Sequence, residues 1–331
     1  LATDIWRWAG VAIGGGLRDD SPLLAWIRAV ATALVAGVIA KLMLEATGSL
    51  YIEANDSLAS MDGFGALVTI DQVLEIDSNP ALASIGGFGS LASVGNYVEI
   101  AENDLLTVIG GFDALVAARH LIIADNALLE DISGFNALAS FVAAADDASA
   151  GDIRIEGNSA LEALSGFASL EHLPGDLVIQ ENVSLVSITG FAALADVGGN
   201  LHIFLNDALA VVGMVELSHV GGSVDIYSNP ALIELGGLGS LASCGGYFWI
   251  DTNAALESLD DLDALQAIGW YLKITDNSAL PTCEAEAFAE HLVDLGFDGD
   301  ITISGNGDGD CGDEDPDGGV DDVDSGLDGG E

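Results

Sequence analysis

From residue 49 onward, two hydrophobic patterns alternate along the chain. A short stretch alternates apolar and polar residues, as in Leu74-Glu-Ile-Asp77, and apolar residues then recur at about every third position. In the second unit the latter are Leu82, Ile85, Phe88, Leu91 and Val94. The first pattern predicts a short strand with one buried face, because successive side chains of a strand point to opposite faces. A period of three fits neither an α-helix nor a strand and predicts a series of turns.

This two-part unit recurs about every 24 residues, in register with asparagine. All eleven copies have isoleucine three positions before the asparagine, and ten have leucine three positions after it. The asparagines are Asn55, Asn79, Asn103, Asn126, Asn158, Asn182, Asn206, Asn229, Asn253, Asn277 and Asn306. Such a period is typical of solenoids, in which each repeat packs on its neighbours. We therefore predict a mainly all-β fold, a parallel β-solenoid of about eleven coils whose strands pair from coil to coil.

The asparagines themselves have a structural interpretation. Stacked inward, each side-chain amide bonds backbone groups of the turns above and below, which would otherwise be unpaired. This predicts an asparagine ladder along the solenoid, and the alternative is a ligand-binding role. The sequence predicts this structural role in particular for Asn79, Asn103, Asn182, Asn206 and Asn253.

The repeat divides the chain into three predicted segments. Residues 1–48 have no net charge, contain three of the five tryptophans and include an apolar run at residues 29–40, so they are predicted to be helical. A membrane helix through residues 23–44, an export signal and a soluble amphipathic cap are the three interpretations of this segment. Residues 49–311 form the solenoid. Residues 312–331 are an acidic, Gly- and Asp-rich tail of the composition typical of disorder.

Two deviations within the array predict local features. Asn126 and Asn158 are eight residues further apart than the usual spacing, which places a surface loop near residues 143–151. After Asn277, residues 284–295 have Phe288, Leu292 and Leu295 near one helical face, and Gly296 follows as a C-cap. We expect this helix to close the open end of the solenoid.

Charge excludes several classes of partner. The chain has 53 acidic and 7 basic residues, a formal net charge of −46. It therefore repels nucleic acids and anionic lipid surfaces, and no basic patch offsets this. The sequence contains neither the H-E-x-x-H nor the G-x-S-x-G motif, and we predict a protein that is not an enzyme and has no metal site or cofactor.

One weak calcium motif lies at the start of the acidic tail. Asn306, Asp308, Asp310 and Asp317 have EF-hand-like spacing. However, Cys311 stands where that loop requires glycine. A solvated tail is the alternative interpretation.

The outward strand positions lie two, four and six residues before each asparagine, and they change character along the array. In the early repeats they are mostly acidic or small, whereas later ones are aromatic. The aromatic set is His202, Phe204, Tyr227, Tyr247, Trp249 and Tyr271. Adjacent strands would bring these rings into one patch that binds a glycan or a protein, with polar contacts from Asp225, Asp251 and Lys273. Cross-strand packing that only stabilises the sheet is the alternative.

The repeat, of the form L-x-I-x-x-N-x-x-L followed by a Gly-Phe or Gly-Leu corner, resembles the receptor L-domain family over residues 49–311. This resemblance implies a leucine-rich-repeat-like solenoid that acts in recognition outside the cell. Paired cysteines flank the terminal cap in similar bacterial members, which implies a disulfide between Cys283 and Cys311. Two free thiols are the alternative.

The N-terminal segment has a resemblance of its own. Residues 4–8, 17–21 and 26–41 look like part of an AzlD-like branched-chain amino-acid transport subunit, which implies a fragment, a fusion or a misjoined reading frame. The function predicted for the whole chain is non-enzymatic recognition or adhesion, or a structural spacer, at the surface of a bacterium or secreted from it. The alternative is a membrane-anchored fusion.

Overall fold

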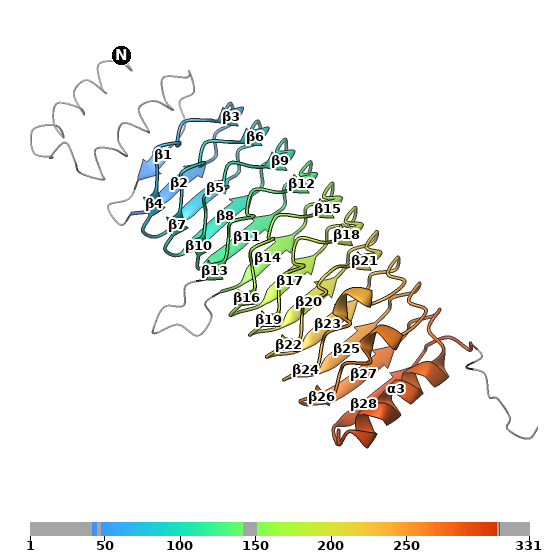
Figure 1. The fold of residues 1–331 in the computed structure, drawn as a ribbon. Helices are drawn as coiled ribbons and strands as arrows, with labels where there is room; N and C mark the ends of the chain where they lie inside the picture. The colour runs from blue at the N-terminus through green and yellow to red at the C-terminus, as the bar shows by residue number, and fades with distance from the viewer. Residues whose placement is uncertain (1–41, 45–47, 142–150, 310, 312–331) are drawn as a thin grey trace, which may run out of the picture.

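The computed structural model describes residues 42–44, 48–141, 151–309 and 311, and in these the fold is a parallel β-solenoid. Its principal sheet has twelve strands, of which all but the first pair in parallel (Figure 1). In chain order they are β1 (Leu42–Leu44), β2 (Leu50–Glu53), β5 (Leu74–Asp77), β8 (Tyr97–Ala101), β11 (His120–Ala124), β14 (Ile153–Glu156), β17 (Leu177–Gln180), β20 (Leu201–Phe204), β23 (Val224–Tyr227), β25 (Phe248–Asp251), β27 (Tyr271–Thr275) and β28 (Asp300–Ser304). The repeat isoleucines pair with one another from strand to strand, so the predicted fold class is confirmed.

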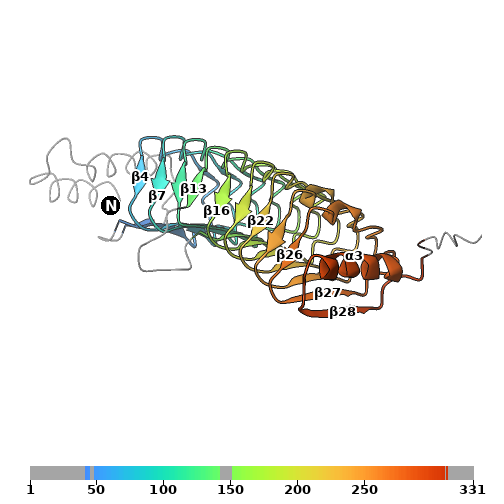
Figure 2. The same cartoon turned by 60° about the horizontal axis from the view of Figure 1, so that its bottom comes forward.

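The segments of period three do more than turn, because each of the first seven coils contains two further strands of two residues. They form a seven-stranded sheet and two shorter sheets that follow one another along a third side (Figures 1 and 2). The first is made of β3 (Ser60–Met61), β6 (Ser84–Ile85), β9 (Val108–Ile109), β12 (Asp131–Ile132), β15 (Ala163–Leu164), β18 (Ser187–Ile188) and β21 (Val211–Val212). The third side comprises β4 (Thr69–Ile70), β7 (Ser93–Val94), β10 (Ala117–Ala118), β13 (Ser140–Phe141), β16 (His172–Leu173), β19 (Asp196–Val197), β22 (His219–Val220), β24 (Ser243–Cys244) and β26 (Ala267–Ile268). In the later coils, turns that include η1 (Gly236–Leu238) and η2 (Asp260–Leu262) stand in place of the strands of the seven-stranded sheet.

The eleven strands predicted from the asparagine repeat are present, but they enclose fewer complete turns than the eleven coils expected. About nine turns are regular, because the last strand begins no further coil and the connection before it contains a helix. Each turn points its period-three residues inward, and in the second coil all five are buried. The result is one continuous apolar core along the solenoid axis.

Phenylalanines stack inside the first six coils. Neighbouring ring centroids lie 4.6–5.8 Å apart, with interplanar angles of 3–16°. The stack contains Phe64, Phe88, Phe112, Phe135, Phe167 and Phe191. In the next three coils Met214, Leu238 and Leu262 are the buried residues of the corresponding turns.

The predicted asparagine ladder is confirmed. Each asparagine donates its backbone N–H and its side-chain amide to the Oδ1 of the next asparagine, from Asn55 to Asn306. Asn182, for example, also donates from Nδ2 to the carbonyls of Ile155 and Gln180, at 2.9 Å each. The buried turns thus obtain the hydrogen bonds that an apolar core denies them.

The residue before every ladder asparagine adopts a left-handed conformation, with φ between 50° and 71°. Only two of the eleven are glycine, although this region disfavours other residues by about 1–2 kcal/mol. The eleven are Ala54, Ser78, Glu102, Asp125, Gly157, Glu181, Leu205, Ser228, Thr252, Asp276 and Gly305. The ladder bonds on either side hold this conformation, since they fix the direction in which the chain leaves the strand.

At the N-terminal end, the described part of the predicted helical segment is not helical. Residues 42–44 form β1, which pairs antiparallel with β2. The pairing satisfies the backbone groups at this edge of the sheet, which a helix would leave exposed. The rest of the membrane or signal interpretation lies outside the described residues, as do most of the predicted loop at 143–151 and the tail at 312–331. Within the described residues, the structure contains no helix with both the length and the apolar character required to cross a bilayer.

Helix α3 (Thr282–Asp294) closes the C-terminal end, as predicted. Its buried residues are Ala285, Ala289 and Leu292, whereas Leu295, expected on the same face, is half exposed beyond the last turn. Gly296 ends the helix with φ of 102°. Cys283 and Cys311 are joined by a disulfide, which is the pairing that the family resemblance implies.

Candidate functional site

The outer face of the twelve-stranded sheet presents three rows of side chains, six, four and two residues before each asparagine. Burial alternates along the strands as the sequence predicted, with inward residues buried and outward ones partly exposed. Because the strands pair in register, equivalent residues of neighbouring coils lie side by side. The residue type at an outward position therefore determines the surface of the sheet at that coil.

Over the early strands, this face gathers carboxylates. Partial burial raises the pKa of Glu75 and of Glu99, and neighbouring negative charges raise both further. Burial and nearby acidic residues likewise raise the pKa of Asp77, against a hydrogen bond from Ser78. Tyr97 donates a hydrogen bond to Glu75 at 3.0 Å. These carboxylates repel one another at neutral pH and contain no arrangement that would select a ligand.

From β20 onward the same face is aromatic. Phe204 stacks on Tyr227 with centroids 4.5 Å apart, and Tyr227 stacks on Trp249 at 5.3 Å. Lys273 covers the far side of Trp249, with its Nζ 4.2 Å from the ring centroid and 3.7 Å from Asp251. The stacked rings therefore cover each other's faces and present mainly their edges to solvent.

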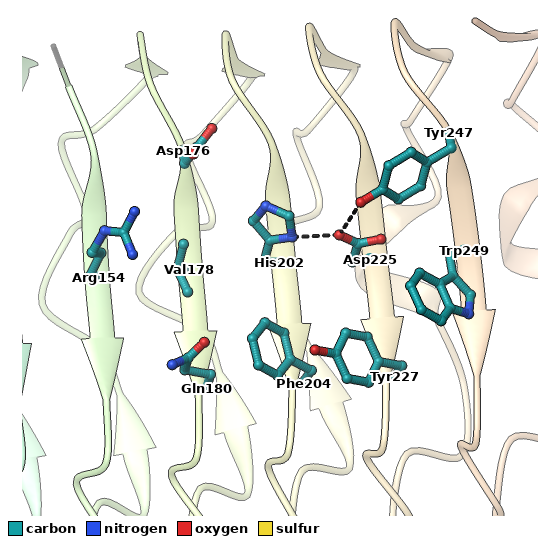
Figure 3. Close-up of a pocket in the computed structure, with 10 residues that line it drawn as sticks. All are labelled: Arg154, Asp176, Val178, Gln180, His202, Phe204, Asp225, Tyr227, Tyr247 and Trp249. Carbon is teal, nitrogen blue, oxygen red and sulfur yellow. Dashed lines mark hydrogen bonds and ion pairs between the residues drawn. The ribbon is translucent and has the colours of Figure 1, made fainter. Parts of the chain in front are cut away.

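A hydrogen-bond network centred on Asp225 lies beside this stack (Figure 3). His202 Nδ1 is 2.6 Å from Asp225 Oδ2, and the Tyr247 hydroxyl donates to the same oxygen at 2.9 Å. Burial and the neighbouring Asp225 raise the pKa of Tyr247 to about 12, so it remains a donor. Asp225 is buried, and its Oδ1 has no hydrogen-bond partner; the buried Nε1 of Trp249 has none either. Unpaired buried polar atoms are costly, so each of them calls for a structural or functional explanation.

These residues line an open groove of about 360 Å³ across five neighbouring strands (Figure 3). Its volume is at the small end of the range for small-molecule sites. The groove extends from β14 to β25, and the ten residues that line it are Arg154, Asp176, Val178, Gln180, His202, Phe204, Asp225, Tyr227, Tyr247 and Trp249.

The structure brings five of the six predicted aromatic residues to the groove. Tyr271 is adjacent and stacks on Tyr247 at 4.8 Å, without lining it. Of the predicted polar contacts, Asp225 lies in the groove, whereas Asp251 and Lys273 pair with each other. The ring stacking expected of the packing interpretation is present, and binding stays a prediction.

Sequence reasoning missed the other wall of the groove, on β14 and β17. The sequence pattern did not single out Arg154, Asp176, Val178 or Gln180 as site residues. Two signals were available: Arg154 is one of only seven basic residues, and Val178 is a small apolar residue at an outward position. A short side chain between longer ones makes a hollow.

Metal or catalytic chemistry finds little support in this face. Among the described residues, no three His, Cys, Asp or Glu side chains come together in an arrangement that would hold a metal ion. At the calcium motif, Asn306 Oδ1 accepts the ladder bonds of Asn277, and Asp310 and Asp317 lie outside the described residues. The groove lining contains no serine, threonine or cysteine that His202 would activate as a nucleophile.

No protein-family model, curated protein or solved structure matches this chain. The resemblances to receptor L-domains and to an AzlD-like subunit therefore stay predictions. The geometry of the groove is the basis for assigning a function.

Proposed function

We propose that this protein is a non-catalytic recognition module that binds a glycan along the groove from β14 to β25. The observation that carries the proposal is the buried carboxylate of Asp225, which has an unpartnered oxygen within a cluster of aromatic residues. A structural spacer would have no use for such a site, since it costs stability. The rest of the outer face, with its carboxylates, provides the solubility that a surface protein needs.

Aromatic and polar side chains alternate in the groove, which is the composition of sites for polar ligands with apolar faces. Arg154 and Gln180 supply donors, and Asp176 supplies an acceptor. Phe204 and Val178 supply apolar surface. A glycan offers hydroxyl groups and C–H faces together, so it matches both kinds of lining residue.

An extracellular or cell-surface location, as in the receptor L-domains that the repeat resembles, belongs to the same proposal. The disulfide between Cys283 and Cys311 supports it, because such bonds persist in oxidising compartments.

The test is a glycan array probed with the full chain. We expect binding to a defined subset of saccharides and its loss in the double variant Phe204→Ala, Trp249→Ala. The matched control is Glu75→Ala, Glu99→Ala, which alters the same face of the early coils. If the wild type binds no glycan at micromolar concentration, the glycan assignment is wrong, and a protein ligand becomes the hypothesis to test.

A further inference from the structure

The deepest part of the groove is a slot above Val178. Arg154, Val178 and His202 are register partners on β14, β17 and β20. At the usual spacing of strands, Arg154 and His202 therefore lie about 10 Å apart, with one strand between them. Val178 is shorter than both neighbours and is buried at the floor (Figure 3). The slot is thus one strand wide, with a basic residue on one wall and an imidazole on the other.

One face of Phe204 borders this slot. Tyr227 covers the opposite face of the ring by stacking. The register partner of Phe204 on the slot side is Gln180, whose Nε2 donates to Glu156 at 3.0 Å and so leans toward β14. Phe204 is accordingly the ring of the stack with a face left for a ligand, and the apolar face of a sugar ring packs well on such a surface.

The His202 ring is held in one orientation and one tautomer. Because Asp225 accepts, Nδ1 carries the hydrogen, and in the neutral ring the lone pair is on Nε2. Figure 3 shows Nε2 on the side of the ring away from Asp225. Asp225 and Tyr247 are therefore positioning residues, and they leave Nε2 available to a ligand hydroxyl, as an acceptor when the ring is neutral and as a donor when it is protonated.

Two further polar groups lie at the slot: Arg154 is a positively charged donor, and Asp176 is a negatively charged acceptor. Within the described part of the chain, Arg154 has no ion pair or hydrogen bond, although acidic residues are abundant. Asp176 accepts from the backbone and side chain of Asn200 at 2.7 and 3.0 Å through Oδ1. The two charges balance locally, while the field of a chain with net charge −46 repels anions.

From this geometry we propose that the slot is a subsite for one uncharged pyranose unit, which rests on the glycan function proposed above. The sugar ring packs on Phe204 above Val178. Its hydroxyls donate to His202 Nε2 and to Asp176, and they accept from Arg154. A uronic or sialic acid unit is disfavoured by the negative field, and since the charges of Arg154 and Asp176 balance locally, the slot itself does not select a charged sugar.

The decisive variant is Val178→Phe, which fills the slot and leaves the aromatic stack in place. Isothermal titration of the full chain uses the uncharged oligosaccharide bound best on the array. We expect at least a tenfold loss of affinity. Ala124→Phe, which introduces the same ring at an outward position outside the groove, is the control and should bind normally. If Val178→Phe binds as tightly as wild type while Phe204→Ala, Trp249→Ala does not, the subsite is wrong and the recognition function stands.

A second measurement tests the positioning of His202 without depending on the fold of the filled variant. In ¹⁵N NMR of the wild-type chain, addition of the oligosaccharide should shift the Nε2 resonance of His202. Asp225→Ala should remove the preference for one tautomer, and His202→Gln should weaken binding at least fivefold. An unchanged Nε2 resonance at saturation, or tighter binding of an acidic than of an uncharged oligosaccharide, would overturn the proposal.

Discussion

The early and the late coils of this solenoid place their aromatic rings on opposite sides of the chain. From Phe64 to Phe191 the rings stack inside, and the outer face has carboxylates. From His202 onward the stacked rings lie outside, while Met214, Leu238 and Leu262 occupy the interior positions of the early phenylalanines and Phe248 is buried on β25. The exchange takes place within one coil, between Phe191 and Phe204.

This difference shows which of the aromatic residues the solenoid fold requires. A repeat of about 4.8 Å brings like residues to stacking distance in any row, so ring stacks form inside or outside with equal ease. The interior accepts either phenyl rings or aliphatic chains, since both bury apolar area. A continuous row of outward rings is not required for folding, because the early coils pack with only isolated outward tyrosines such as Tyr97. The continuous row in the late coils therefore calls for a function.

We expect the largest effect on stability from a substitution in the phenylalanine stack inside the early coils. Phe112→Ala removes a buried ring that contacts two others, and we expect a loss of about 3–5 kcal/mol of unfolding free energy. Urea denaturation measures it. Leu238→Ala in the late coils serves for comparison and should cost about 2–5 kcal/mol. A loss below 1 kcal/mol for Phe112→Ala would show that the stack does not stabilise the early half.

The asparagine ladder should contribute equally to both halves. Asn103→Ala and Asn229→Ala each remove the same set of hydrogen bonds and leave backbone groups unpaired. We expect a loss of about 2–4 kcal/mol for each, from the cost of buried unsatisfied groups. Denaturation midpoints of the two variants should agree closely. A large difference between them would mean that the halves differ in their backbone as well as in their rings.

The outer stack should matter less for stability than for binding. Trp249→Ala removes a partly exposed ring, so we expect a loss of about 1–1.5 kcal/mol of stability. Affinity for the glycan should fall by more than about 1 kcal/mol, as at an interface hot spot. Thermal denaturation and titration calorimetry measure the two quantities. A stability loss of about 3 kcal/mol or more would instead identify Trp249 as part of the core.

The smallest effect concerns the acidic face of the early coils. The raised pKa values of Glu75 and Glu99 mean that folding favours their protonated forms. Their contribution to stability is therefore fully present below the pKa of an unfolded glutamate, about 4.3, and is lost as pH rises through the folded value. We expect the double variant Glu75→Gln, Glu99→Gln to melt higher than wild type at pH 7 and to gain less stability on acidification. The same substitutions at Glu130 and Glu162, which lie away from this face, serve as the control.

The coil was predictable because its strand and its asparagine obey a strict pattern. The left-handed residue before each asparagine was not, since side chains as different as Ala54, Glu102 and Thr252 occupy that position. Hydrogen bonds of the ladder determine its conformation, so the identity of the residue carries little signal. Only Gly157 and Gly305, which stand at the same position in their coils, indicate the left-handed conformation in the sequence.

The aromatic row was predictable for the same reason as the coil: its members recur in register. The groove was not, because a hollow depends on the relative length of side chains on adjacent strands. Val178 becomes a floor only beside Arg154 and His202. Likewise, one oxygen of Asp225 is unpaired because of the directions in which neighbouring side chains donate their hydrogen bonds. The repeat pattern does not give these directions.

Because every link of the asparagine ladder is chemically the same and has the same direction, the solenoid can change length one coil at a time. Excision of residues 79–102 would join Ser78 to Asn103 and bring Asn55 against Asn103, the partner that Asn79 has now. The molecule would shorten by one strand spacing, and the groove near the other end would keep its shape. Duplication of a coil between β17 and β20 would instead separate Val178 from His202. Gain and loss of whole coils thus offers a route by which such a chain acquires new surfaces without new folding chemistry.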